Sequence, residues 1–312
     1  MIFCKNNLTR LTIGLAILLL TAACKGNDEF VVPAFLHVDA IKVASQQGRP
    51  AGHNTSKIGT AYVVAYYPGR SAVDTVGVFE LPFTVPVLFN GDAEYIEIYP
   101  AVQMSGVSAL RPYYPFYETI VLNDGTVLPS GDTLRLHFGA GDTLRFDTLT
   151  TSYTQLATTL LEEYFEPTQS SILFDSVVQW ISRDAEAACS GQGCGKVHVN
   201  AGQSHVDFSM TERPPEVEDA TVALFMELDY RSTKRLSVEM KSAETRGANE
   251  TTKEIVTLNP TDSWKKIYIN LRTTWKQFSY NPSFLIVFSA LNAEGTEGDV
   301  WLDNIKILST PY

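Results

Sequence analysis

Basic residues are scarce in this sequence. Lys and Arg number 24 against 35 Asp and Glu, which gives a formal net charge of −11 at pH 7. Nucleic acids and anionic lipid surfaces are bound by clustered Lys and Arg side chains, and no such cluster occurs along the chain. We therefore expect no nucleic acid partner. With 45% hydrophobic and 11% aromatic residues, the chain has ample material for buried cores.

Motifs that carry catalysis are also missing. The five histidines form no H-x-x-x-H pair, and neither a G-x-S-x-G elbow nor a phosphate-binding loop is present. Glu162, Glu163 and Glu166 are the best candidates for acid/base work. A glycosidase, however, needs two carboxylates that face each other across the scissile bond, and closeness in sequence does not supply that. We predict that the protein is not an enzyme, with a surface glycoside hydrolase as the second alternative.

Long hydrophobic runs are absent as well. The longest is LTIGLAILLL at residues 11–20, which is shorter than the about 20 residues needed to span roughly 30 Å of hydrocarbon. Lys5 and Arg10 precede it, and three small residues lead from it to Cys24. A charged start, a short apolar run and small residues at the end are typical of an export signal. We predict that residues 1–23 are removed.

This start resembles a bacterial lipoprotein signal, in which the cysteine at the cleavage point is lipidated. It departs from the usual pattern because Thr21 stands where Leu is preferred. The resemblance implies that Cys24 carries acyl chains. The following KGNDEF resembles the acidic export tag of Bacteroidota surface lipoproteins, which implies an outer-membrane, cell-surface location. An acidic flexible tether over residues 24–34 is the other interpretation of these residues.

Cysteines are few, and each has an expected role. Of the four, Cys4 lies in the signal and Cys24 takes the lipid. In an oxidising compartment the other two, Cys189 and Cys194, are expected to form a disulfide across the glycine-rich SGQG loop.

From residue 35 onward the sequence alternates apolar and polar residues and is rich in β-branched types, with turn signals between the runs. This pattern predicts an all-β protein whose first domain, residues 35–150, is an antiparallel sandwich. Residues 79–102 resemble a PEGA-like or transthyretin-like hairpin, which implies an Ig-like module. We expect the aromatic run at 111–118 to lie half inside the core. Strands are predicted at 35–43, 61–67, 76–81, 95–102, 117–122 and 132–138.

The second half, residues 151–312, carries EEYFE at 162–166, SWKKIYINL at 263–271 and WLDNIKIL at 301–308. These motifs resemble the galactose-binding-like jelly roll of many carbohydrate-binding modules. The resemblance implies a β-sandwich jelly roll, and in such folds an early acidic residue and a late Asp often hold a structural calcium ion. It nominates Glu166 and Asp303, with Glu163 as a weaker choice. Alternatively, Asp303 accepts a hydrogen bond from a nearby backbone amide.

A sugar-binding face requires an exposed aromatic plane with polar groups at its rim. The sequence offers such groups in TTWKQFSYNPS and at one strand end, while Trp180, Trp264 and Trp301 lie in apolar alternation and are expected in the core. A protein-contact face would use the same residue types. The candidate ligand-binding residues are Trp275, Phe278, Tyr280, Tyr230 and Arg231.

Together these features predict a non-enzymatic, lipid-anchored cell-surface binding protein with two β-sandwich domains. The first interpretation is an accessory subunit that docks onto an outer-membrane protein complex. The alternative is a glycan-binding lipoprotein that uses its C-terminal jelly roll. The structural calcium ion is the only cofactor that the resemblance implies.

Overall fold

The computed structural model describes residues 32–44, 53, 55–67, 74–87, 95–123, 136, 141–167, 174–175, 177–182, 188–215, 217, 222–243, 249–278 and 283–311. Strands in five sheets make up almost all of the regular structure, so the predicted all-β class is confirmed. The described residues include no helix with the length and apolar character to cross a membrane. Cys24, the export signal and Tyr280 lie outside the described residues, as do Trp180's side chain and all of the expected 132–138 strand except Leu136.

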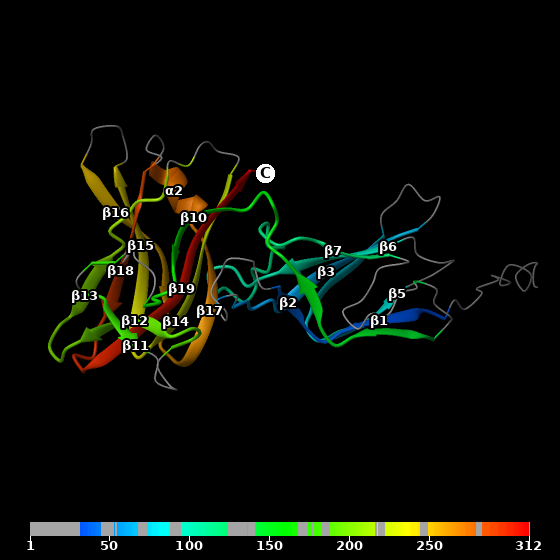
Figure 1. Cartoon of the computed structure of the whole chain (residues 1–312), viewed down its shortest axis with the longest axis horizontal. Helices are drawn as coiled ribbons and strands as arrows, with labels where there is room; N and C mark the ends of the chain where they lie inside the picture. The colour runs from blue at the N-terminus through cyan, green and yellow to red at the C-terminus, as the bar shows by residue number, and fades with distance from the viewer. Residues whose placement is uncertain are drawn as a thin grey trace, which may run out of the picture.

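The first nine strands form one lobe, which we call the amino-terminal lobe (Figure 1). It contains three sheets, in the orders β5-β1-β8, β4-β3-β6-β7 and β2-β9. The strands are β1 (Ala34–Val38), β2 (Ile41–Val43), β3 (Thr60–Tyr66), β4 (Asp74–Glu80), β5 (Phe83–Val87), β6 (Tyr95–Ala101), β7 (Ile120–Asn123), β8 (Thr143–Phe146) and β9 (Leu149–Thr151).

Alternation along these strands turns one face of each sheet toward a common core. Leu36 and Val38 of β1 and Ile96 and Ile98 of β6 are all buried in it. Two pairings differ from the antiparallel prediction, because β1 runs parallel to β8 and β2 runs parallel to β9. The hairpin predicted at 79–102 is wrong: β5 pairs with β1, whereas β6 pairs with β3 and β7 of another sheet.

The later strands form the carboxy-terminal lobe. The boundary predicted at residue 150 falls in β9, the last strand of the amino-terminal lobe. Besides strands, this lobe holds the short helix α2 (Arg272–Trp275) and the turn η1 (Lys276–Phe278). The strands are β10 (Thr158–Glu163), β11 (Gln179–Ser182), β12 (Gly193–Val199), β13 (His205–Ser209), β14 (Val222–Ser232), β15 (Arg235–Ala243), β16 (Glu250–Leu258), β17 (Thr261–Asn270), β18 (Leu285–Leu291) and β19 (Gly298–Pro311).

Two sheets pack face to face in this lobe. One has the order β11-β12-β19-β14-β17, with β10 also paired to β19, and the other has the order β13-β18-β15-β16. From β12 to β19 the chain passes repeatedly between the two sheets, as in a jelly roll. Their inner faces share one core, which includes Leu228 and Ile269 from the larger sheet and Val238 and Phe288 from the smaller.

The lobes meet on the outer face of the larger sheet, the face turned away from the carboxy-terminal core (Figure 1). Phe225 and Leu308 project from this face and belong to the same buried cluster as the amino-terminal core. Tyr114 and Phe116 cover them, which places most of the aromatic run 111–118 inside, while Tyr113 remains 52% exposed. One continuous apolar core therefore joins the two lobes.

Candidate functional site

The outer face of the larger sheet carries a row of buried charges beside the apolar contact. Lys266 of β17 lies 3.4 Å from Glu227 and 3.6 Å from Asp229 of β14. Tyr114 and Tyr153 donate hydrogen bonds of 3.0 and 2.8 Å to Glu227 from the amino-terminal lobe. The two tyrosine hydrogen bonds link the lobes at a row of buried charges.

The ionisation of this row follows from its surroundings. Burial opposes the charged form of Glu227, but the ammonium groups of Lys266 and Lys306 and the two tyrosine hydroxyls outweigh it, so the pKa of Glu227 is lowered. Burial likewise disfavours charged Lys266, yet Asp229 and Glu227 raise its pKa. Glu227 and Lys266 therefore hold each other in their charged forms.

Next to this row, the Ser190 hydroxyl, the His53 imidazole and the Glu166 carboxylate follow one another in space. His53 Nε2 is 3.1 Å from Glu166 Oε1, and His53 Nδ1 is 3.3 Å from Ser190 Oγ. This order is that of a nucleophilic triad. However, Nδ1 lies closer to the Asn304 side chain, at 2.7 Å, and both His53 and Ser190 are buried. The group acts as a buried hydrogen-bond network that fastens residue 53 to the carboxy-terminal lobe.

The residues nominated for calcium act as hydrogen-bond acceptors. Glu166 accepts from the Gln192 amide at 2.5 Å, and Glu163 accepts from the Phe165 amide at 2.7 Å. Asp303 accepts from the amides of Ser190 and Asn304 at 3.1 and 2.7 Å, which is the alternative role that the sequence left open. Within the described ranges, no three His, Cys, Asp or Glu side chains are grouped as metal ligands. The calcium ion stays a prediction.

Cys189 and Cys194 flank the loop that these carboxylates hold. Both are thiols in the structure, and no disulfide joins them in the part of the chain described. Burial, followed by the nearby carboxylates of Asp229 and Asp303, raises the pKa of the Cys189 thiol well above its usual value. The predicted disulfide is therefore not formed in this structure.

Two tryptophans expected in the core lie instead on the outer face of the larger sheet. Trp264 and Trp301 are only half-buried and belong to neither core cluster. Arg231 lies between them, with its guanidinium carbon 4.2 Å from the Trp301 ring centre and 5.8 Å from the Trp264 ring centre. The Lys196 ammonium lies 5.3 Å from the Trp301 ring centre. The tryptophan faces are thus occupied by cations.

Trp275 and Phe278, two of the residues predicted to form an open aromatic face, do not do so. Phe278 is 1% exposed and lies in the core, and Trp275 packs against that core. Tyr230 is also buried among core residues, and Arg231 stacks on Trp301. An exposed face at Trp275 and Phe278 is therefore wrong, because α2 and η1 turn these rings inward.

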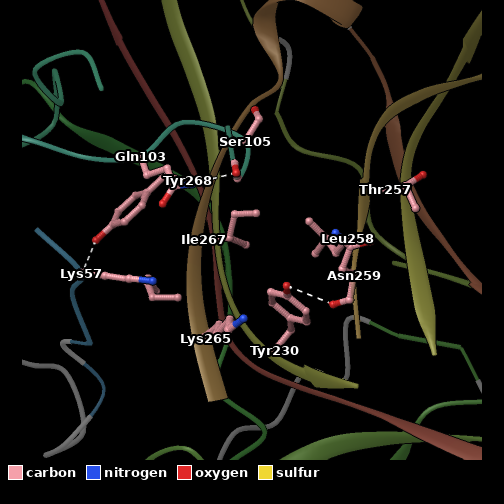
Figure 2. A pocket seen from close by; sticks show the side chains of 12 residues that line it. Lys57, Gln103, Ser105, Tyr230, Thr257, Leu258, Asn259, Lys265, Ile267 and Tyr268 are labelled. Carbon is pink, nitrogen blue, oxygen red and sulfur yellow. Dashed lines mark hydrogen bonds between the residues drawn. The ribbon is translucent and has the colours of Figure 1, made fainter. Parts of the chain in front are cut away.

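A pocket of about 250 Å³ opens where the two lobes meet (Figure 2). We call it the junction pocket. Segments far apart in the sequence line it: the segment at Lys57, the 103–106 turn, the end of β16 with the following Asn259, and strands β14 and β17. The lining residues are Lys57, Gln103, Ser105, Gly106, Tyr230, Thr257, Leu258, Asn259, Lys265, Lys266, Ile267 and Tyr268.

Hydrogen bonds between the lobes shape this pocket. The Ser105 amide donates to the Tyr268 carbonyl at 2.7 Å, which attaches the 103–106 turn to strand β17. The Lys57 amide donates to the Tyr268 hydroxyl at 2.9 Å. On the opposite wall, the Tyr230 hydroxyl donates to the Asn259 carbonyl at 3.4 Å (Figure 2). Each wall is thus held by backbone contacts, so the pocket is preformed.

Of the predicted ligand residues that the structure describes, only Tyr230 lines the pocket. Sequence reasoning missed the other lining residues because no local pattern marks them. Lys57, Gln103 and Asn259 are ordinary polar residues in loops, and they converge only through the packing of one lobe on the other. A signal such as a motif or a fixed spacing does not exist for such a site.

A second surface lies on the amino-terminal lobe, on the outer face of the β4-β3-β6-β7 sheet. Five partly exposed tyrosines gather there around Glu97. Tyr66 stacks on Tyr95 at 4.1 Å, and Tyr66 and Tyr99 donate hydrogen bonds to Glu97, which raise the pKa of both phenols. We call this surface the tyrosine face; its tyrosines are Tyr62, Tyr66, Tyr95, Tyr99 and Tyr113.

Comparisons with known proteins give matches only among solved structures: no family model and no curated protein matches the chain. One similar structure is a family 11 carbohydrate-binding module from Clostridium thermocellum in complex with a β-1,3-1,4-mixed-linked tetrasaccharide, with 12% identity, a TM-score of 0.32, and coverage of 47% of this chain and 94% of that chain. Another is the family 30 carbohydrate-binding module of a Clostridium thermocellum cellulosomal cellulase, with 17% identity, a TM-score of 0.33, and coverage of 49% and 96%. A third, TmCBM61 in complex with β-1,4-galactotriose, has 16% identity, a TM-score of 0.29, and coverage of 46% and 89%. These TM-scores are low, so the fold assignment rests on the sheets described above.

Proposed function

We propose that this protein is a non-catalytic, lipid-anchored saccharide-binding protein of the cell surface, and that the junction pocket holds a sugar ring. The observation that carries the proposal is the make-up of the pocket. Its floor is apolar, from Ile267, Leu258 and the Tyr230 ring, and its rim is polar, from hydroxyl, amide and ammonium groups.

This combination suits a sugar because a pyranose has both apolar C–H faces and a ring of hydroxyls. Small-ligand sites combine mostly apolar walls with a few placed polar groups, in volumes of about 300–1,000 Å³. A pocket of about 250 Å³ lies just below that range and fits a single sugar unit better than a larger cofactor. Because the walls are preformed, binding orders few side chains and loses little affinity to entropy.

The lining also favours binding over hydrolysis. Glycoside hydrolysis usually takes two carboxyl groups on either side of the scissile bond. The twelve residues that line the junction pocket include no Asp or Glu. Glu162, the remaining acid/base candidate, accepts a hydrogen bond of 2.5 Å from Tyr164 and does not line the pocket. We therefore propose that the protein captures a glycan and leaves it intact.

The cellular location of the protein is part of the proposal. We propose that Cys24 is lipidated after removal of residues 1–23 and anchors the chain at the outer membrane. Stable attachment to a membrane generally takes more than one acyl chain, and a lipoprotein cysteine supplies several. Mass spectrometry of the N-terminal peptide from membranes tests this point: an unmodified Cys24 thiol with the leader still attached would contradict it.

A glycan array followed by calorimetry tests saccharide binding. The array identifies an oligosaccharide, and calorimetry then compares the wild type with Thr257→Trp, which places an indole in the pocket. Thr252→Trp is the matched control, since Thr252 is an exposed residue of the same strand outside the lining. We expect binding by the wild type and by Thr252→Trp, and a loss of at least tenfold in affinity for Thr257→Trp. The absence of binding to any glycan on the array, or equal affinities for the two variants, would contradict the proposal.

A second candidate function is docking onto an outer-membrane protein complex, and the tyrosine face favours it. Tyrosines are enriched at protein interfaces because each combines a large apolar ring with a hydroxyl. Exposed Val78 and Val121, at 49% and 43%, lie on two strands of the same sheet. Together with the tyrosines they form an apolar surface with polar tips.

Co-purification from native outer membranes in mild detergent tests this candidate. Docking predicts a stoichiometric partner that is recovered with the wild type and lost with Tyr113→Ser combined with Val78→Ser. Leu156→Ser is the control, because Leu156 is 63% exposed and lies outside all four strands of that sheet. Recovery that is unchanged in the double variant, or a protein that purifies alone, would contradict docking through this face.

A further inference from the structure

We infer that the junction pocket selects saccharides that carry an anionic substituent, a carboxylate or a sulfate ester. This inference rests on the proposed saccharide binding and names the class of sugar. The starting observation is a local imbalance of charge. Among the described residues, the lining contains three lysines and no carboxylate, in a chain whose net charge is −11.

One of the three lysines is already neutralised. The Lys266 ammonium lies 3.4 Å from Glu227 and 3.6 Å from Asp229, and it is within 3.3 Å of the Thr55 hydroxyl. Its charge is used inside the carboxy-terminal lobe, against two carboxylates of the neighbouring strand β14. The excess positive charge of the pocket therefore comes from the other two lysines.

Lys57 and Lys265 bring that charge from opposite lobes. Both side chains are exposed, and neither ammonium has an ion pair with any of the residues described. Their positions are fixed through the backbone: the Lys57 amide donates to the Tyr268 hydroxyl, and Lys265 pairs with Tyr230 in the β14–β17 register. Both lie in the lower half of Figure 2, below Gln103 and Ser105.

The nearby carboxylates do not offset these two ammonium groups. Glu227 and Asp229 are shared with Lys266. Glu254 accepts a hydrogen bond of 2.9 Å from the Thr257 hydroxyl, but Glu254 itself is not among the described lining residues and has no ion pair with Lys57 or Lys265 in the described part of the chain. Asp262 lies on the same strand as Lys265, three residues away, so its side chain points to the other face of the sheet. The complementary negative charge is thus left for a ligand to supply.

A bound acidic sugar satisfies this arrangement. Its ring lies on the floor of Ile267, Leu258 and Tyr230, and its anionic group lies at the rim between Lys57 and Lys265. Hydrogen bonds between an ammonium and an anion are shorter and stronger than neutral ones. Lysine acts as a flexible point charge, so the pair accepts either a planar carboxylate or a tetrahedral sulfate.

Calorimetry with matched probes tests the inference. One pair of probes is oligogalacturonate and its methyl ester, in which a small methyl group replaces the carboxylate charge. The other pair is sulfated and unsulfated galactan oligosaccharides, which differ only in the sulfate. We expect the charged member of at least one pair to bind about tenfold more tightly than its neutral partner, and the pair that shows the preference identifies the anion.

Three variants separate the lysines from the rest of the pocket. Lys57→Gln and Lys265→Gln are each expected to reduce the preference severalfold, with binding of the neutral probe unchanged. Lys42→Gln is the control, since Lys42 is an exposed lysine of β2 outside the lining. Higher salt should weaken the binding of the charged probe alone.

The outcomes distinguish this inference from the proposed function. Equal affinities within both probe pairs would overturn the inference and leave saccharide binding intact. A preference that survives in both lysine variants would also overturn it, because the charge would then be recognised elsewhere. If no saccharide binds the wild type, the proposed function fails and the inference fails with it.

Discussion

Single buried charges determine much of the behaviour of this protein at the scale of residues. Lys266 neutralises Glu227 and Asp229, which are both buried. Replacing it by methionine leaves two carboxylates without their cation, and breaking a buried pair in this way typically costs about 3–5 kcal/mol. We expect Lys266→Met to lower the free energy of unfolding by that amount in urea denaturation. Lys265→Met, at the exposed neighbouring position, should change it by less than about 0.5 kcal/mol; equal effects would contradict the account.

Asp303 makes stability depend on pH. Burial raises the pKa of Asp303 to about 8 in the folded protein, whereas an unfolded Asp titrates near 3.9. Between about pH 4 and 8 the folded state therefore holds a proton that the unfolded state releases, so stability falls as the pH rises. Urea midpoints measured from pH 5 to 8, below the range in which an unfolded cysteine ionises, should fall for the wild type.

Asp303→Asn provides the control for this effect, because an amide does not ionise. Its urea midpoints should be nearly constant over the same range. Glu227 does not interfere, since its lowered pKa removes stability only as the pH falls into the acidic range. A wild-type profile as flat as that of the variant would show that Asp303 does not titrate in this window.

The limits of sequence-based prediction are clear at this scale. Alternation of apolar and polar residues does not say which polar face of a sheet another lobe will cover. Nothing in the sequence marks Glu227 and Lys306 as buried, although both are. Trp264 and Trp301 looked like core residues for the same reason. Burial on the outer face is decided by contacts between segments far apart in the sequence.

At the scale of elements, the loop between β11 and β12 depends on a glycine that space requires. Gly191 has a φ of +62°, and a Cβ there would overlap Glu166 and His53. Gly202 has a φ of +83° with open space around it. We expect Gly202→Ala to cost about 1–2 kcal/mol from the left-handed backbone alone, and Gly191→Ala to cost at least about 2 kcal/mol more. Similar unfolding free energies for the two variants would contradict the packing described for this loop.

The prediction of elements succeeded where each strand is a local pattern. Strands β3 and β6, predicted at 61–67 and 95–102, show the alternation that marks a half-buried strand. Pairing was harder to predict, because it depends on where the chain crosses between sheets. At Leu81–Pro82 the chain leaves the β4 sheet for the β1 sheet, so the expected 79–102 hairpin does not form. Similarly, the inward turn of α2 and η1 was not visible in the sequence.

At the scale of the whole molecule, the amino-terminal core extends onto the outer face of the carboxy-terminal lobe and joins the two lobes. Phe225 packs edge-on against Tyr114 at 5.5 Å across the junction. Cutting a buried phenylalanine back to alanine typically costs about 3–5 kcal/mol, and here the loss falls on the junction. We expect a single cooperative transition for the wild type in calorimetry, and two separated transitions for Phe225→Ala. Two transitions already in the wild type would show that the lobes fold independently.

Length, composition and the two sets of motifs predicted an all-β chain with two β-sandwich parts, but they did not predict the contact between them. The contact creates the junction pocket, and the pocket has no counterpart in any single stretch of sequence. This explains why the predicted ligand residues lie within the carboxy-terminal half, whereas the pocket also takes Lys57, Gln103 and Ser105 from the other lobe.

A crystal structure of the full chain with an oligosaccharide found on the array tests the central claim most directly. The account predicts density for a sugar ring against Tyr230 and Ile267, between the two lobes, with its substituent toward Lys57 and Lys265. Density over the tyrosine face or beside Trp301, with the junction pocket empty, would contradict it.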